Sequence, residues 1–452
     1  MLNHDLTTAP IKGLIRHMAL PVVIGFFFNT MFNVVDTYFA GQISPTALAA
    51  LSLSFPIFFL IIIFDAGMST GITSLIANAL GAKNHEIVEK YTAQAISFGI
   101  IISLFLTIGG ILISPFLFKI LGAEGEYLHF ATSYINIIFF GSVFFMMISV
   151  FNSLLQARGN TKILRNFLIV GFFLNVIFDP WFLYGGFGVP AMGIGGIAFA
   201  TILVQIIGTI YLLWQLIKAK IVTKDTLRKL KPEPRIFIEI LKQALPASVN
   251  LATIGIGIFI ITYFISPFGE TAVAAYGIAT RIEQIALLPI IGIAIACLSI
   301  VGQNNGARKF DRITETYKLC LKYGIMIMAT GTILIFTFAK QAMQFFTNDL
   351  EIIATGTHYL KIASFIAIAY ALLSITISAL QGMKKPMYAV WIGLYRQILA
   401  PIAVFYLLVK IFDMGIDGIW WGVFGITWSA AIFTIIYGRS ILIPKGIKNI
   451  VS

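Results

Sequence analysis

Long apolar runs dominate the chain, and Gly, Pro and charged residues gather at the breaks between them. A helix that crosses a bilayer needs about 20 predominantly apolar residues. Twelve stretches meet this requirement, namely residues 14–41, 46–80, 86–118, 125–157, 162–186, 193–218, 236–267, 271–305, 310–345, 351–382, 386–411 and 415–440. The pattern therefore predicts an all-α polytopic membrane protein with twelve transmembrane helices.

The composition agrees with this prediction and excludes other classes of protein. A soluble protein carries about 25% charged residues, whereas this chain has 11% charged and 59% hydrophobic residues and a mean hydropathy of +0.93. A soluble enzyme and a disordered chain are excluded on these grounds. The only cysteines, Cys297 and Cys320, lack the spacing of a metal site or redox motif. We interpret the first apolar run as a retained span, because no small-residue cleavage site follows it.

The positions of the basic residues predict the orientation in the membrane. Lys and Arg concentrate in the cytoplasmic segments of membrane proteins. If both termini lie in the cytoplasm, nearly all Lys and Arg residues near the span ends lie on the cytoplasmic side. Only Lys119, Lys340 and Lys410 then lie on the outer side. This bias predicts cytoplasmic termini and explains the net charge of +12 without a nucleic-acid partner.

Short motifs occur twice along the chain, always the same number of residues apart. We call this number, which is the separation in sequence between Pro21 and Pro246, the repeat spacing. The pairs are Leu20-Pro21 with Leu245-Pro246, Ala47–Ala50 with Ala272–Ala275, Gly81–Lys83 with Gly306–Arg308, and Leu155-Gln156 with Leu380-Gln381. A later pair, Gly193–Ile197 with Gly415–Ile419, has a slightly shorter spacing, consistent with a small deletion.

The repeat predicts two lobes. Each repeat holds six spans, so both insert the same way up, as six-helix bundles related by a pseudo-two-fold axis along the membrane normal. We expect an N-lobe over 1–220 with the cation and substrate site, a cytoplasmic linker over 221–235 and a C-lobe over 236–452. Such paired bundles are typical of transporters.

Several motifs, in order along the chain, resemble the multidrug and toxic compound extrusion (MATE) family. They are LPVVIGFFFNTMFNVVDTYFAGQIS with Asp36, the Gly81-Ala82 helix end, LLQARGNTK and LNVIFDPWFLYGG. Asp36 together with Asn175-x-x-x-Asp179-Pro180 resembles the DinF-like prokaryotic branch. Another branch is known for acidic cation-binding residues in the first and fourth helices of the second lobe, and here those helices offer no intramembrane Asp or Glu.

The resemblance covers nearly the whole chain and implies a function. It implies a secondary active transporter, not an enzyme, in the prokaryotic cytoplasmic (inner) membrane. The implied activity is multidrug efflux: export of amphipathic, often cationic organic compounds in exchange for H⁺ or Na⁺. We expect no cofactor besides this coupling ion, and partners limited to small organic substrates and the bilayer, with the chain acting as a monomer.

Ionisable residues inside the spans are the candidates for coupling, because a buried charge costs about 2.5–3.5 kcal/mol on insertion scales. Counting about 1.5 Å per residue from the outer helix ends places Asp36, Asp179 and Thr201 at roughly the same depth. Asn175 lies one turn deeper on the face of Asp179. Two neighbouring carboxyls can carry a proton, and their oxygens, with the amide and hydroxyl, also suit Na⁺. The resemblance assigns the cation-coupling role to the same four residues; the alternative is that they only hold helices together.

We also predict roles for other polar residues in the spans and for two prolines inside helices. The predicted substrate cavity contains Asn29, Asn33, Tyr134, Asn152 and Gln156. Pro21 and Pro180 are predicted hinges, because each removes a backbone hydrogen bond, although a static kink is the alternative. Asp65 lies too deep to join the acidic cluster, which favours helix packing or an inner vestibule.

In the second lobe, Arg281, Glu283, Lys361 and Arg396 form a predicted polar network near mid-depth. A structural ion-pair network is the favoured interpretation, and a cavity wall or separate proton site is the alternative.

The predicted mechanism is alternating access with antiport, and three other activities fit the sequence less well. A flippase for lipid-linked precursors is the main alternative, but it would need a cationic cavity for a diphosphate, and the first lobe is acidic. A channel would need a continuous polar stripe on many helices. A membrane enzyme would need acid, base or metal groups at interface depth, and the sequence offers none.

Overall fold

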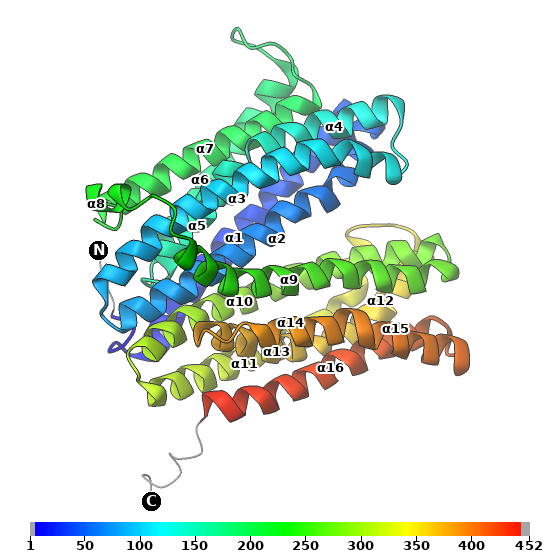
Figure 1. The fold of residues 1–452 in the computed structure, drawn as a ribbon. Helices are drawn as coiled ribbons and strands as arrows, with labels where there is room; N and C mark the ends of the chain where they lie inside the picture. Colours follow the sequence, from blue (N-terminus) through cyan, green and yellow to red (C-terminus); the bar gives the residue numbers. More distant parts are fainter. Residues whose placement is uncertain (1–4, 444–452) are drawn as a thin grey trace, which may run out of the picture. The chain divides into compact units, whose positions relative to one another are not determined.

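The computed structural model describes residues 5–443, which are almost entirely helical (Figure 1). The first repeat contains α1 (Ile11–Ile43), α2 (Pro45–Gly81), α3 (His85–Ile120), α4 (Gly125–Phe140), α5 (Ser142–Gln156), α6 (Lys162–Tyr184), α7 (Ile194–Lys218) and the short α8 (Lys224–Arg228). The second contains α9 (Pro234–Ile265), η1 (Ser266–Phe268), α10 (Glu270–Gly306), α11 (Phe310–Gln344), α12 (Leu350–Ser364), α13 (Ile366–Gly382), α14 (Met387–Leu394), η2 (Tyr395–Leu399), α15 (Ala400–Phe405), η3 (Tyr406–Ile411) and α16 (Gly415–Leu442). Within these limits the structure has no β-strand, only an isolated bridge between Gly186 and Val189.

The number of membrane spans agrees with the sequence prediction. Ten helical segments of the described chain are long and apolar enough to cross a bilayer, and two bent pairs bring the total to twelve. The pairs α4–α5 and α12–α13 bend by 44° and 49°. At the first bend, Ile202 of α7 approaches Gly141 so closely that a side chain at this position would clash. The all-α polytopic fold with twelve spans is thus confirmed.

The repeat is present in the helices as well as in the motifs. Both α2 and α10 are 37 residues long, and the repeat spacing separates their first residues and also their last residues. The starts of α3 and α11 are separated by the same spacing. The eleventh span departs from its counterpart α6, because the π-helical segments η2 and η3 lie on either side of the short α15. Pro401 in α15 cannot donate a backbone hydrogen bond, and π turns are one way in which membrane helices accommodate this loss.

The described chain divides into two compact units whose edges differ from the predicted lobes. One unit is Ile24–Ser248, and the other joins the segment up to Val23 with the chain from Val249 onward. The predicted lobe limits at residues 220 and 236 stay a prediction. Buried Gln94 of α3 explains one difference, because its Nε2 donates to the carbonyl oxygens of Lys229 and Lys231, each at 2.8 Å. These bonds hold the segment before α9 in the Ile24–Ser248 unit.

Candidate cation-coupling site

Four polar side chains from three helices meet inside the Ile24–Ser248 unit. Asp36 belongs to α1, Asn175 and Asp179 to α6, and Thr201 to α7. The exposed fraction is 6% for Asp36, 5% for Thr201 and 0% for the other two residues. Groups so far from water need partners, because an unpaired buried polar group is costly.

Glycines bring the three helices close enough for these side chains to touch. A Cβ on Gly196 of α7 would lie 2.5 Å from the carbonyl oxygen of Phe182 in α6, so only glycine fits there. Gly25 of α1 lies against Leu168 of α6, where a Cβ would be 3.1 Å from Leu168 Cδ1. This close packing lets the short side chains of Asp36 and Thr201 reach the face of α6.

The amide of Asn175 joins the two carboxyls. Its Nδ2 donates to Asp36 Oδ1 and to Asp179 Oδ1, each at 2.9 Å. Thr201 Oγ1 lies 3.4 Å from Asp36 Oδ2 and also donates to the carbonyl oxygen of Ile197 at 3.1 Å. The carboxyls of Asp36 and Asp179 are thus joined through one amide and interact electrostatically.

The cluster retains unused oxygen atoms. Asn175 Oδ1 and Asp179 Oδ2 are buried and have no hydrogen-bond partner among the described residues. No three His, Cys, Asp or Glu side chains gather to hold a metal ion anywhere in residues 5–443. A cation at this site would therefore be bound by two carboxyls and neutral oxygens, a ligand set suited to a proton or a small hard cation.

The MatE family model matches residues 21–181 and again residues 246–407. The chain belongs to the MatE family. The two matches begin at Pro21 and Pro246, which define the repeat spacing, so the family model recognises each repeat separately. The MATE resemblance is confirmed by this match.

Individual MATE relatives are similar along nearly their whole length. "Probable multidrug resistance protein NorM" of Thermotoga maritima is 28% identical over 422 residues, 91% of this chain and 88% of the relative. "Probable multidrug resistance protein YoeA" of Bacillus subtilis is 25% identical over 414 residues, 90% and 89% of the two chains. A solved structure, "Outward-facing conformation of a multidrug resistance MATE family transporter of the MOP superfamily", has a TM-score of 0.90, 25% identity and 98% coverage of both chains. The chain is thus an integral membrane protein of a multidrug transporter family.

The predicted substrate-cavity residues of this MATE chain lie in different surroundings. Tyr134 of α4 is 8% exposed and interacts electrostatically with Asp36 and Asp179. Asn29 and Asn33 are exposed on α1, and Asn33 Nδ2 donates to the backbone carbonyl of Asn29 at 2.8 Å, not to the acidic cluster. Only Tyr134 is brought to the carboxyls.

The remaining two cavity candidates, Asn152 and Gln156, are buried together on α5, with Asn152 Nδ2 3.4 Å from Gln156 Oε1. Asp65 of α2 contacts the same helix, because its backbone carbonyl accepts a hydrogen bond from Ser149 Oγ at 3.0 Å. The structure therefore places these polar groups along α5, apart from the hydrogen bonds of the acidic cluster.

The role of the predicted polar network in the second half stays a prediction. No salt bridge joins Arg281, Glu283, Lys361 or Arg396 to one another in the described structure. Aromatic side chains satisfy three of them instead. Glu283 shares a hydrogen bond with Tyr359, Arg396 lies 5.2 Å from the ring centre of Tyr370, and Lys361 Nζ lies 5.7 Å from that of Phe336. The sequence offered one signal for this arrangement, since the repeat spacing separates Tyr359 from Tyr134.

Pro21 and Pro180 lie inside α1 and α6, and both helices continue past them. Their role as hinges stays a prediction.

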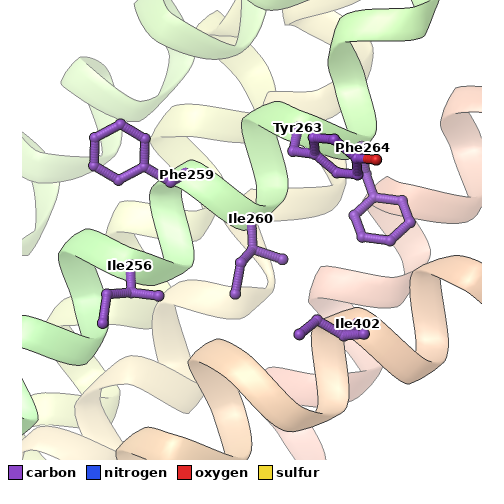
Figure 2. A pocket seen from close by; sticks show the side chains of 6 residues that line it. All are labelled: Ile256, Phe259, Ile260, Tyr263, Phe264 and Ile402. Carbon is purple, nitrogen blue, oxygen red and sulfur yellow. The ribbon is translucent and has the colours of Figure 1, made fainter. Parts of the chain in front are cut away.

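An apolar groove, of about 500 Å³, lies on the α9 region that corresponds to the Asp36 region of α1. Figure 2 shows its six lining side chains, which come from α9 and α15: Ile256, Phe259, Ile260, Tyr263, Phe264 and Ile402. None carries a charge, and the tyrosine hydroxyl is the one polar group among them. The groove has no group that could bind a coupling ion.

Proposed function

We propose that this MATE protein exports amphiphilic, often cationic organic compounds in exchange for an ion carried by Asp36 and Asp179. The relatives named as multidrug resistance proteins support the export of drugs. The observation that carries the coupling role is the buried amide of Asn175 between two carboxyls. Two carboxyl groups in one site that is shielded from water strongly favour the binding of one proton or other cation.

A proton is the coupling ion that this geometry supports best. The amide of Asn175 presents its N–H₂ group, not its oxygen, to both carboxyls. A Na⁺ ion between the carboxyls would need an oxygen there, so the amide would have to turn over.

Exchange then follows from competition for the same negative charge. A cationic drug stabilises the ionised carboxyls, and a proton neutralises them, so the two ligands favour different states of the protein. Aromatic rings on the same two helices, α1 and α6, suit flat organic cations. Phe28 of α1 lies 5.5 Å from Phe172 of α6, and Phe172 lies 5.1 Å from Phe173, measured between ring centres.

A flippase for diphosphate-linked lipids has no support at this site. Its ligand is anionic, and the buried cluster would repel it. We therefore propose no second function.

The test is drug efflux from vesicles that carry the purified protein, with a pH gradient or a Na⁺ gradient imposed separately. Ethidium is the probe, and wild type is compared with Asp36→Asn and Asp179→Asn. We expect the pH gradient to drive wild-type export and both variants to lose it. Export driven only by the Na⁺ gradient would mean that Na⁺, not a proton, is the coupling ion. Full gradient-driven export in both variants would refute the proposed site.

A further inference from the structure

Asp65 is an acid inside a membrane-spanning helix that the coupling site does not use. It lies near the middle of α2 (Pro45–Gly81), and its Oδ1 atom is buried without a hydrogen-bond partner among the described residues. No salt bridge within residues 5–443 includes it. An ionised carboxyl inside a membrane costs about 2.5–3.5 kcal/mol on insertion scales. Asp65 therefore needs a proton or a positively charged partner.

Neutral polar groups form a strip between α2 and α5, and Asp65 lies at its start. Ser149 Oγ donates to the backbone carbonyl of Asp65 at 3.0 Å, and Ser153 Oγ lies 3.2 Å from Ser69 Oγ. Both bonds join residues that are 84 positions apart, so the two helices run parallel and in register. Thr73 follows Ser69 by one turn on the same face of α2 and is fully buried. Its Oγ1, like Asp65 Oδ1, has no partner in the described part of the chain.

Two aromatic rings extend this strip on the other side of Asp65. Phe58 of α2 and Phe145 of α5 meet edge to face, with ring centres 5.7 Å apart and an interplanar angle of 69°. Phe58 precedes Asp65 by two helical turns, on the same face of α2. Phe145 precedes Ser149 by one turn, on the same face of α5. Both rings and Asp65 are partly exposed. A carboxyl about 10 Å along the helix from two rings suits a flat organic cation.

The second half shows that the packing of α2 against α5 does not require an acid. At the repeat spacing from the three polar residues of α2, helix α10 carries Ile290, Ala294 and Leu298. All three are buried, with exposed fractions of 2%, 8% and 4%. The equivalent of α5, helix α13, still lies close to α10, since a Cβ on its Gly382 would be 2.7 Å from the carbonyl oxygen of Leu298. Close packing therefore does not explain Asp65.

Asp65 lies deeper in the membrane than the coupling pair. Helix α1 ends at Ile43 and α2 begins at Pro45, so depth along both helices is counted from the same predicted outer side. At about 1.5 Å per residue, Asp36 is about 10 Å from this side and Asp65 is about 30 Å from it. Both positions belong to the Ile24–Ser248 unit. A compound that enters from the predicted cytoplasmic side therefore reaches Asp65 before it reaches Asp36.

We propose that Asp65 and the adjoining strip form a second cation-binding site, which takes the positive group of an exported organic compound. The positive group lies beside Asp65 Oδ1 and supplies its missing charge partner, while the flat body of the compound lies against Phe58 and Phe145. The hydroxyl oxygens of Ser69 and Thr73 extend the site for compounds that carry N–H groups. The place of this site in export rests on the proposed antiport, but binding itself does not depend on which ion is coupled.

The test is equilibrium binding of two aromatic probes to the purified protein in detergent, measured by fluorescence without any ion gradient. Ethidium carries a positive charge, and N-phenyl-1-naphthylamine is uncharged at neutral pH. We expect Asp65→Asn to raise the Kd of ethidium about tenfold or more, equal to about 1.4 kcal/mol, and to leave the Kd of the uncharged probe within about twofold. Asp65→Ser is a second neutral variant in case Asp65→Asn does not fold.

Further variants show which part of the compound each group binds. Asp65→Glu keeps the charge and should retain most of the ethidium affinity. Phe145→Leu should weaken both probes by about threefold, because the ring contacts the flat body of the compound. Glu283→Gln in the second half should change neither Kd. Asp65→Asn should also weaken ethidium binding in an Asp36→Asn background, because the two sites are separate.

An ethidium Kd that is unchanged in Asp65→Asn, or an equal loss of affinity for both probes, would overturn the second site and leave Asp65 with a structural role. Asp65-dependent ethidium binding in a protein that exports ethidium under neither gradient would refute the proposed antiport and leave this site standing.

Discussion

The two halves of the molecule keep an equivalent tyrosine but supply its acidic neighbours from different helices. Tyr134 interacts with Asp36 of α1 and Asp179 of α6, whereas its repeat equivalent Tyr359 shares a hydrogen bond with Glu283 of α10. Only the first half brings two carboxyls together. The comparison shows that a repeated helical bundle preserves positions without preserving chemistry, and it supports our proposal that one half carries the coupling ion.

The second half differs from the first in its backbone as well as in its acidic residues. The repeat spacing pairs Asp36 with Ile261, and the slightly shorter spacing of the Gly193 and Gly415 motifs pairs Asp179 with Pro401. Ile261 lies in the hydrophobic core, and Pro401 lies in the short α15 between two π-helical segments. A buried carboxyl pair therefore cannot form there without changes in several residues.

The largest expected effect is the loss of coupled export in Asp36→Asn and Asp179→Asn. Each change removes a group that takes up and releases the proton, and we expect the initial rate of ΔpH-driven ethidium export to fall about 100-fold. Glu283→Gln is the matched control in the other half and should retain most of the rate. A similar loss in all three variants would remove the distinction between the halves.

Placing an acid at the equivalent position of the second half should destabilise the protein without adding transport. Ile261 is 9% exposed, and Ile261→Asp would bury an unpartnered carboxyl at a cost of about 2.5–3.5 kcal/mol. The measurement is the midpoint of thermal unfolding in detergent, with Ile261→Asn as the uncharged comparison. Unchanged stability of Ile261→Asp would show that water already reaches this position and that it can hold a charge.

Removing the bridging amide should have an intermediate effect. Asn175→Ala deletes two hydrogen bonds to carboxyls, and one such bond contributes about 1.5–3 kcal/mol when it binds a charged group. Without these donors the carboxyls hold protons more readily, so the pH midpoint of export should rise. Export rates measured across pH test this, with the exposed Asn166→Ala on the same helix as control. A midpoint equal to that of wild type would mean that the amide does not tune the site.

The smallest expected effect separates the two tyrosines. Tyr134→Phe removes a buried hydroxyl that interacts electrostatically with the coupling carboxyls and should slow export by about twofold to fivefold, which corresponds to up to ~1 kcal/mol. Tyr359→Phe removes a partner of Glu283 and should lower the unfolding temperature without slowing export. If Tyr359→Phe slows export as much as Tyr134→Phe, both halves take part in coupling.

Much of this picture could be predicted from the sequence, because the membrane imposes strong constraints on it. The lengths of the apolar runs predicted the twelve spans, and an acid in an apolar helix singled out Asp36. The spacing of Asn175 and Asp179 placed both on one face of α6, as the structure shows. Helix period and depth were sufficient for these residues.

The sequence was insufficient where tertiary contacts decide the outcome. The edges of the two compact units could not be predicted, because the bonds of Gln94 to the segment before α9 join residues that are far apart in the sequence. The ion-pair network was predicted from opposite charges alone, whereas aromatic neighbours such as Tyr370 already satisfy Arg396. Opposite charges on different helices do not reveal which partner lies closer.

The most direct measurement of the central claim is ion movement driven by a drug gradient alone. Liposomes carrying the protein receive ethidium on one side, with no imposed ion gradient, while pH-sensitive and Na⁺-sensitive dyes report the opposite compartment. We predict a proton flow against the ethidium flow in wild type and in Glu283→Gln, and none in Asp36→Asn or Asp179→Asn. Proton counterflow that persists in both aspartate variants would contradict the assignment of coupling to this acidic pair.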